Sequence, residues 1–126
     1  MSNSANLLFS ASHEWIQSSG DVRRVGITDH AQHLLGDIVY TDLPKVGRKV
    51  KKGEAILVVE SPKAAADVYA PLSGEVVEVN GALEGEPSKI NQDPYGDGWL
   101  VAIRVSSADE AGELMSEADY KKSIGE

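Results

Sequence analysis

Short apolar runs separated by Gly, Pro, Asp and Asn set the strongest limit on how this chain can fold. Each run is too short for a long helix and is bounded by residues that favour tight turns. The pattern predicts seven short strands, at residues 13–16, 22–27, 37–43, 55–60, 67–70, 75–79 and 99–105. Many short strands with tight turns are typical of sandwiches and barrels, so we predict a mainly β fold.

Two segments have the pattern of short helices. Thr28 can cap a helix over residues 29–35, with Asp29 in its first turn and Gly36 at its end. Near the C-terminus, Ser116 and Asp119 have the spacing of a capping box, and apolar side chains around them can dock a final short helix. Residues 107–114 can add a helical turn before it.

The length of the chain fits one domain. With 126 residues it can bury a modest core but has no room for a second, catalytic domain. Residues 1–6 are small and polar, so we expect a flexible N-terminus, followed by a single domain over residues 7–126.

Composition excludes several classes of function. Twelve basic against twenty acidic residues give a net charge of −8, which opposes binding to nucleic acid. There is no cysteine, so any sulfur redox chemistry must come from an attached cofactor. No metal-ligand spacing such as HExxH is present, and no apolar stretch approaches the roughly 20 residues that cross a bilayer. The first residues show neither a signal peptide nor an Arg-rich presequence, so we expect a cytoplasmic protein without a membrane anchor.

An internal similarity suggests two related halves. At an offset of 38, GDIVYTDLPKVGRKVKKG aligns with GEVVEVNGALEGEPSKIN, and the identical pairs are Gly36/Gly74, Val39/Val77, Gly47/Gly85 and Lys51/Lys89. Two copies are fewer than a solenoid needs, which favours two similar halves packed face to face. Chance similarity among strands rich in Gly and Val is the alternative. The stretch between the copies, VVESPKAAADVYAP, must cross from one half to the other.

Within that stretch a lysine is expected at the tip of a hairpin. Ser61 followed by Pro62 suits a type I turn between two strand-like runs, which places Lys63 at the tip. The alanines that follow are small, so an enzyme can approach the lysine amine. The competing interpretation is an ordinary solvated lysine, because exposed turns often contain one.

Five blocks of sequence, in order, resemble the H protein family of the glycine cleavage system. They are HEW at 13–15, VGITDHAQ at 25–32, LGDIVYTDLPKVG at 35–47, VVESPKAAADVYAPLSGEVVEVN at 58–80 and NQDPYGDGWL at 91–100. The resemblance implies a lipoyl-domain-like barrel-sandwich hybrid of two similar halves. The chain departs from the family pattern at Pro62, where valine is common, and at Ala66, where serine is common. Proline stiffens the tip and removes a backbone donor.

The resemblance also implies a carrier function without catalytic residues. Lys63 would carry lipoic acid in amide linkage, attached by a lipoate ligase or lipoyl transferase. The arm would take an aminomethyl group from a pyridoxal-phosphate-dependent glycine decarboxylase (P protein) to a tetrahydrofolate-dependent aminomethyltransferase (T protein). Dihydrolipoamide dehydrogenase (L protein) would then reoxidise it. All catalytic groups would lie on these partners, which agrees with a chain that has no cysteine.

Four polar residues are candidates for a cleft that receives the loaded arm. Ser12, Glu14 and Asp67 match family positions near that cleft, where a carboxylate can hold a protonated amine. His30, in the TDHAQ block, can line the same cleft. Ordinary surface polarity or helix capping explains these four residues equally well.

Three other functions are compared with the carrier of glycine cleavage. Biotinyl carriers also modify a hairpin lysine, but they resemble one another in placing methionine on both sides of it, whereas Pro62 and Ala64 flank Lys63. An H-like protein that donates lipoyl groups to other complexes has no sequence feature that separates it from the glycine role. An independent enzyme using Glu14, Asp67 and His30 would have to be active without lipoate or partners.

Overall fold

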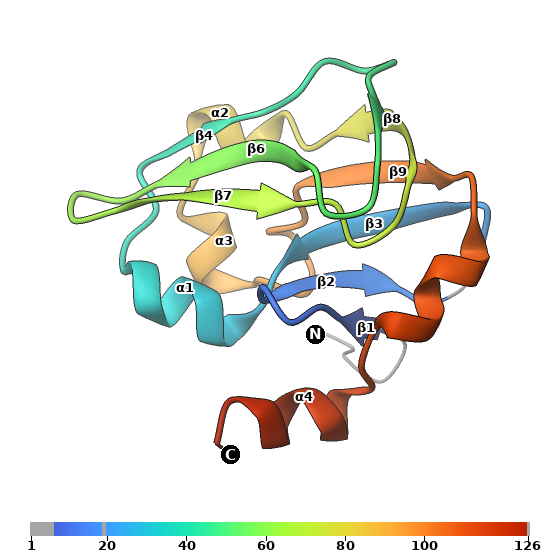
Figure 1. Cartoon of the computed structure of the whole chain (residues 1–126). Coiled ribbons are helices and arrows are strands. Elements are labelled where there is room, and N and C mark those ends of the chain that lie inside the picture. Colours follow the sequence, from blue (N-terminus) through green and yellow to red (C-terminus); the bar gives the residue numbers. More distant parts are fainter. Residues whose placement is uncertain (1–6, 19, 126) are drawn as a thin grey trace.

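The computed structural model describes residues 7–18 and 20–125. The predicted flexible N-terminus, residues 1–6, lies outside the described residues, as do Ser19 and Glu126. Figure 1 shows two β-sheets facing each other, with short helices at their margins.

All strand pairs in the two sheets are antiparallel. The larger sheet has the order β1-β2-β3-β9-β8-β5, formed by Leu7–Phe9, Glu14–Gln17, Val22–Ile27, Val101–Val105, Gly74–Val79 and Lys49–Val50. The smaller sheet has the order β4-β6-β7, formed by Tyr40–Asp42, Ala55–Glu60 and Ala65–Tyr69. Neither sheet closes on itself, so the mainly β prediction is confirmed as an open two-sheet arrangement rather than a closed barrel.

The two predicted helices are confirmed. Helix α1 spans Asp29–Leu35, and the Thr28 hydroxyl accepts a hydrogen bond from the Ala31 N–H at 3.1 Å. Helix α4 spans Glu117–Ser123 and begins at Ser116, whose hydroxyl accepts from the Asp119 N–H at 3.2 Å. The helical turn before it is a 3-10 helix at Ala108–Glu113.

Of the two aligned segments, the first contributes strands to both sheets, β4 to the smaller and β5 to the larger, whereas the second contributes only β8, to the larger sheet. Strand β4 belongs to the smaller sheet, whereas its equivalent β8 belongs to the larger one. Beyond these strands the segments differ, because the second forms two short helices, α2 (Ala82–Gly85) and α3 (Lys89–Gln92). Leu83 and Ile90 from these helices are buried in the core, whereas the first segment continues as extended chain into β5.

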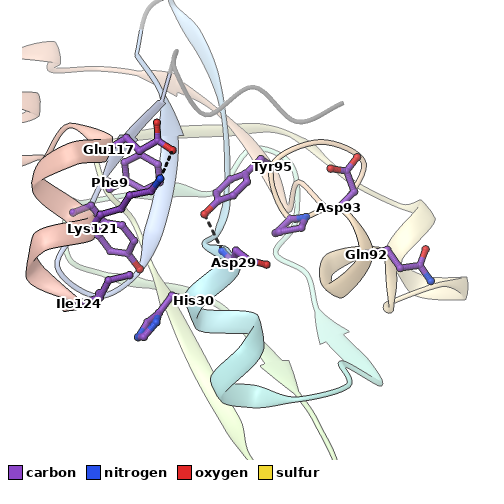
Figure 2. A pocket seen from close by; sticks show the side chains of 11 residues that line it. Phe9, Asp29, His30, Gln92, Asp93, Tyr95, Glu117, Lys121 and Ile124 are labelled. Carbon is purple, nitrogen blue, oxygen red and sulfur yellow. Dashed lines mark hydrogen bonds and ion pairs between the residues drawn. The ribbon is translucent and has the colours of Figure 1, made fainter. Parts of the chain in front are cut away.

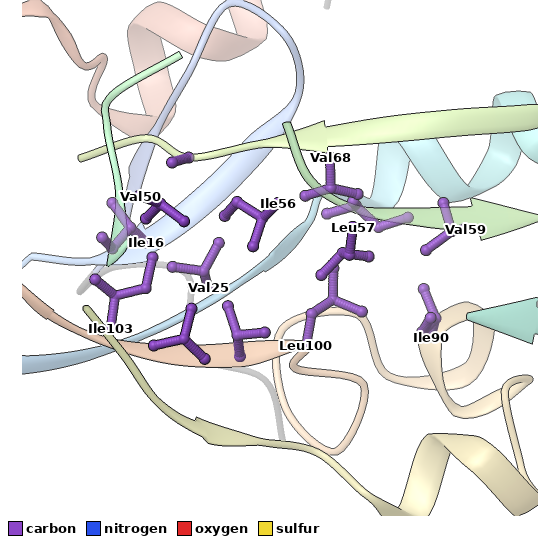
Figure 3. Close-up of a cluster of buried hydrophobic side chains, with 14 of the residues drawn as sticks. Ile16, Val25, Val50, Ile56, Leu57, Val59, Val68, Ile90, Leu100 and Ile103 are labelled. Atoms are coloured by element: carbon purple, nitrogen blue, oxygen red, sulfur yellow. The ribbon is translucent and has the colours of Figure 1, made fainter. Parts of the chain in front are cut away.

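The core lies between the two sheets. Figure 3 shows its aliphatic side chains, which come from β2, β3 and β9 on one side and from β6 and β7 on the other; they include Ile16, Val25, Ile56, Leu57, Val59, Val68, Leu100 and Ile103. Burying each such side chain contributes about 1.5–3 kcal/mol to folding. The hairpin of β6 and β7 is therefore anchored in the core along its length, while its tip projects beyond it near α1 (Figure 1).

A second buried cluster fastens the N-terminal strand and α4 to the larger sheet. It consists of Leu7, Phe9, Trp15, Trp99, Ala102 and Tyr120. The Trp15 ring lies on Gly26, where an added Cβ would stand 2.6 Å from the indole nitrogen, and that nitrogen donates to the Pro94 carbonyl. Glycine at position 26 therefore leaves the space that the Trp15 ring occupies.

Candidate functional site

Lys63 lies at the predicted hairpin tip. Ser61 and Ala64 exchange both backbone hydrogen bonds, at 2.8 and 3.3 Å, which leaves Pro62 and Lys63 as a two-residue loop. Neither loop residue has a positive φ, which agrees with a type I turn and excludes types II, I′ and II′. Pro62, Lys63 and Ala64 are all exposed.

The Lys63 side chain lies beside the end of helix α1. Its Cε stands 3.5 Å, and its Nζ 4.0 Å, from the position that a Cβ on Gly36 would occupy. Gly36 has a φ of +82°, a conformation that L-residues rarely adopt. The absent side chain at Gly36 therefore leaves room for the lysine stem.

Strand β7 has a free edge that leads away from Lys63. Bonded and non-bonded pairs alternate in an antiparallel ladder, so the backbone groups of Ala65, Asp67 and Tyr69 point away from β6. One of these donors is satisfied across the gap between the sheets, because the Tyr69 N–H donates to Glu14 Oε2 at 3.2 Å. A side chain of the larger sheet thus reaches the edge of the smaller one.

Glu14 is a buried carboxylate whose resolved partners are neutral donors. Its side chain accepts from the hydroxyls of Ser10 at 2.6 Å and Ser12 at 2.5 Å, and the residue is only 2 % exposed. Burial raises its pKa above the usual value, and the hydrogen bonds from Ser10, Ser12 and Tyr69 oppose that rise. Within the described residues, Glu14 forms no ion pair.

A cavity of about 440 Å³ opens beside this carboxylate. Its lining includes Ser12, Glu14 and Tyr69, and also Lys52, whose ammonium group is paired with Glu113 at 2.6 Å. A cation entering it would meet an acidic side chain already held by three hydrogen-bond donors.

His30 lines a different cavity, also of about 440 Å³, between α1, α4 and the chain around Tyr95 (Figure 2). Its ring lies 5.0 Å from that of His13, whose Nδ1 is 2.7 Å from the Tyr120 hydroxyl. Burial lowers the pKa of His13, and the neighbouring His30 lowers it further. The two cavities share no lining residue, and the link between them is the ring contact of His30 with His13, which stands between Ser12 and Glu14 in the chain.

The structure thus separates the four cleft candidates. Ser12 and Glu14 are in direct contact. Asp67 is exposed on the free edge of β7, two residues from Tyr69, and lines neither of the two cavities described above. His30 lines the other cavity, beside α4.

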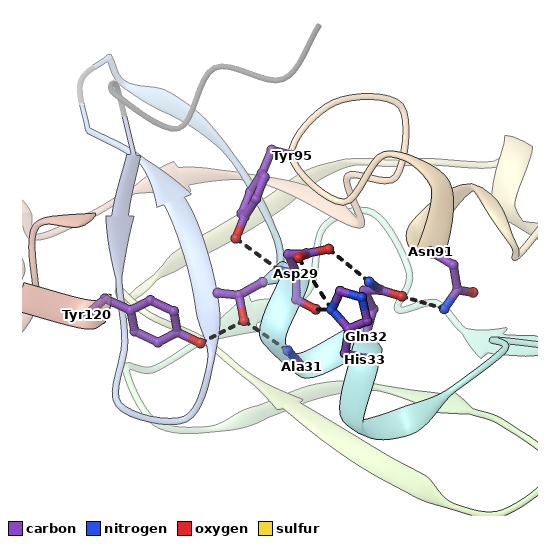
Figure 4. A network of polar contacts seen from close by, with 8 residues as sticks. Asp29, Ala31, Gln32, His33, Asn91, Tyr95 and Tyr120 are labelled. Carbon is purple, nitrogen blue, oxygen red and sulfur yellow. Dashed lines mark hydrogen bonds and ion pairs between the residues drawn. The ribbon is translucent and has the colours of Figure 1, made fainter. Parts of the chain in front are cut away.

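A chain of polar contacts holds α1 in place (Figure 4). At its start, the Tyr120 hydroxyl contacts the Thr28 hydroxyl at 2.8 Å, and the Tyr95 hydroxyl accepts from the Asp29 N–H at 3.0 Å. Along the helix, the Gln32 amide donates to Asp29 and accepts from Asn91, each at 2.8 Å. The capping of α1 is visible in the sequence, but its partners from α3, α4 and the loop at Tyr95 are not.

The described residues contain neither a candidate membrane span nor a cluster of metal ligands. No described helix is long and apolar enough to cross a bilayer. No group of three or more His, Cys, Asp or Glu side chains in the described ranges is arranged to hold a metal ion.

Comparison with known proteins agrees with this architecture. The sequence model of the family described as Glycine cleavage H-protein matches residues 7–126. Glycine cleavage system H proteins of Thermotoga maritima and Bradyrhizobium diazoefficiens are each 54 % identical to the chain over 114 residues. These alignments cover 90 % of this chain and 92 % and 93 % of the two relatives.

A solved structure shows the same fold. The crystal structure of a glycine cleavage system H protein from Mycobacterium marinum superposes with a TM-score of 0.89 and 39 % sequence identity. The match covers 97 % of this chain and 98 % of that one. The chain therefore belongs to the glycine cleavage H-protein family, the lipoyl carriers of the glycine cleavage system.

Proposed function

We propose that Lys63 is the residue of this chain that carries lipoic acid, in amide linkage through its Nζ. The observation that supports this most is the position of Lys63, which is exposed in the two-residue loop of a hairpin anchored in the core. A rigid support with a projecting tip lets a ligase reach the amine without unfolding the chain.

The surroundings of Lys63 fit an acylated side chain. The alanines at 64 and 65 are small and exposed, and Gly36 presents no side chain to the lysine stem. Within the described residues, no carboxylate forms an ion pair with Lys63. Acylation therefore disrupts no ion pair described in the fold.

When bound, the lipoyl group supplies a disulfide that can accept electrons and an aminomethyl group from a decarboxylating glycine enzyme. The chain has no cysteine and so provides no thiol of its own. Its part is to present the arm to separate enzymes, and we propose that it has no catalytic group. Those enzymes are glycine decarboxylase, aminomethyltransferase and dihydrolipoamide dehydrogenase, with a lipoate ligase or lipoyl transferase acting first. We place these partners and the chain in the cytoplasm.

We assign the role of holding a protonated amine to Glu14. Ser10, Ser12 and the Tyr69 N–H hold its carboxylate at the cavity wall. A cation placed there would lower the raised pKa of Glu14 and pair with the ionised form. Exclusion of water from this site would protect the carried group from hydrolysis.

Asp67 would be met before Glu14 by an arm that folds back along β7. It lies four residues from Lys63, about 13 Å at the usual rise of a strand, on the same free edge as Tyr69. We therefore propose that Asp67 guides a cationic end toward the cavity. His30 lines the other cavity, but its ring lies 5.0 Å from that of His13, the chain neighbour of Glu14, and we propose that it borders this path from that side.

The experiment that tests the carrier role is reconstitution of the glycine reaction. The chain is loaded by a lipoate ligase and added to purified glycine decarboxylase, and exchange of labelled bicarbonate into glycine is measured. We expect exchange with the loaded wild type and with Lys51→Arg, a second exposed lysine, and none with Lys63→Arg. Loading without exchange, combined with transfer of lipoyl groups to other complexes, would replace this proposal with the lipoyl-donor role.

A further inference from the structure

We infer that Asn91 is a positioning residue for the acylation of Lys63. It holds the backbone of residues 36–38, here called the 36–38 platform, in the conformation beside which the lysine side chain lies. This inference rests on the proposed function of Lys63 and adds to it a residue that determines how the amine is presented.

The hydrogen bonds of Asn91 converge on the platform. Its Nδ2 donates to the Gly36 carbonyl at 2.8 Å, and its Oδ1 accepts from the Ile38 N–H at 2.8 Å. The same Nδ2 also donates to Gln32 Oε1 at 2.8 Å. One side chain from α3 thus satisfies backbone groups on both sides of Asp37, where α1 has ended and β4 has not begun.

The platform needs such support because its backbone is unusual. Gly36 has a φ of +82°, and its N–H is bonded to the Gln32 carbonyl at 3.0 Å. Glycine is the residue with the greatest conformational freedom, so the sequence alone does not hold this conformation. The Asn91 side chain replaces the ladder hydrogen bonds that the 36–38 platform lacks.

Lys63 depends on that conformation for its contact with the platform. A Cβ added to Gly36 would touch Lys63 Cε at 3.5 Å, so the lysine stem passes over the open face of this glycine, and that face moves with the Gly36 backbone. Among the described residues, the tip at 61–64 makes only the hydrogen bonds of its own turn, so the platform is the neighbouring surface that limits where the lysine stem points. A change in Gly36 therefore changes the presentation of the amine, and Asn91 acts through Gly36.

The first test compares Asn91→Ala with Asn80→Ala. Asn80 is the matched control because its amide also donates two hydrogen bonds of 2.8 Å, to the carbonyls of Asp97 and Trp99, away from the hairpin tip. Two quantities are measured on each chain: the mobility of the Lys63 side chain by NMR relaxation of ¹³Cε without any enzyme, and kcat and KM for acylation by a lipoate ligase.

We expect Asn91→Ala to increase the mobility of Lys63 and to lower kcat/KM for its acylation about tenfold, a misplacement effect. Asn80→Ala should leave both quantities at their wild-type values. Asn91→Asp should not restore them, because a carboxylate keeps the acceptor for Ile38 but faces the Gly36 carbonyl with oxygen. Equal behaviour of the Asn91 and Asn80 variants in both measurements would overturn the inference.

A second pair keeps the test valid if the asparagine variants do not fold. Gly36→Ala and Gly53→Ala both place an alanine at a positive φ, +82° and +85°, but nothing lies within 4 Å of a Cβ on Gly53. Only Gly36→Ala should alter the mobility and acylation of Lys63. A wild-type chain that is never acylated at Lys63 would contradict the proposed function, while the NMR comparison would still decide the inference about Asn91.

Discussion

At the scale of single residues, the burial of Glu14 is the feature that connects stability with function. A buried carboxylate is costly to ionise without a cationic partner, and its resolved partners are two hydroxyls and one backbone N–H. The described fold therefore holds this acidic group by neutral donors alone, beside a cavity that Lys52 and its ion-pair partner Glu113 also line. Its raised pKa makes this cost measurable.

The first prediction concerns the pH dependence of stability. The pKa of Glu14 is raised above 4.5 in the folded chain, so the folded chain binds this proton more tightly than the unfolded one. The resulting stability is fully present below the unfolded pKa and is lost as pH rises through the folded pKa. In chemical denaturation from about pH 4 to about pH 8, Glu14→Gln should therefore gain stability relative to wild type as pH rises.

The control for this prediction is Glu54→Gln. A hydrogen bond from the Lys51 N–H, and then Arg48, lower the pKa of the exposed Glu54, so its stabilising contribution is lost as pH falls. The difference curve between wild type and Glu54→Gln should have the opposite sign. Two curves of the same sign would contradict the assigned environment of Glu14.

The second prediction concerns the pair of histidine rings. Burial is the larger cause of the lowered pKa of His13, and His30 is the smaller. His30→Gln should therefore raise the pKa of His13 toward 6.5 without reaching it, as measured by NMR titration of the imidazole. His33→Gln, an exposed change on the same helix, should leave that pKa unchanged. An unchanged pKa in His30→Gln would show that the rings do not interact.

At the scale of elements, helix α1 organises the site. Its first turn is held by Tyr95 and Tyr120, and its last residue leads into the 36–38 platform beside Lys63. A displacement of α1 would therefore change both the surroundings of Lys63 and the cavity that His30 lines. The N-cap Thr28 is the point where the helix meets α4, through the Tyr120 hydroxyl.

The third prediction tests this N-cap. Thr28→Ala removes the acceptor of the Ala31 N–H and the contact with Tyr120, which should lower the free energy of unfolding by about 1–2 kcal/mol. Thr28→Ser keeps the hydroxyl and should recover most of that loss in thermal or chemical unfolding. Loss of equal size in both variants would mean that the threonine methyl group, and not the cap, stabilises the helix.

Elements with local signals were predicted correctly from the sequence. Helix α1 has its cap, acidic first turn and terminal glycine within nine residues, and residues 29–35 match the structure. Strand β4 was predicted too long, at 37–43 instead of 40–42, because the Asn91 side chain binds Ile38 in place of a ladder partner. The short β1 and β5, and helices α2 and α3, depend on pairing and burial with distant segments and had no local signal.

In the candidate site, too, contacts between residues far apart in the chain could not be predicted from the sequence. The turn residues predict that Lys63 is exposed at a hairpin tip, whereas its carrier role, like the choice of Ser12 and Glu14, is implied by the resemblance to the family. The hydrogen bond of Glu14 with the Tyr69 N–H joins residues 55 positions apart and involves a backbone group, so no residue type in the sequence predicts it. The convergence of Asn91 on Gly36 likewise appears only after α3 has packed against α1.

At the scale of the whole molecule, the two sheets hold different parts of the chain. The larger sheet holds the N-terminal strands and, through the second buried cluster, α4, whereas the smaller sheet is mainly the hairpin that presents Lys63. The shared core and the contact of Glu14 with β7 join them. The hairpin is therefore rigid at its base and accessible at its tip, as a carrier visiting several enzymes requires.

The most direct measurement of the central claim is the intact mass of the chain after incubation with lipoate, ATP and a lipoate ligase, followed by fragmentation. The account predicts a gain of a single lipoyl group located on Lys63, and no gain in Lys63→Arg. No gain in the wild type, or a lipoyl group on any other lysine, would contradict the assignment of Lys63 as the carrier residue.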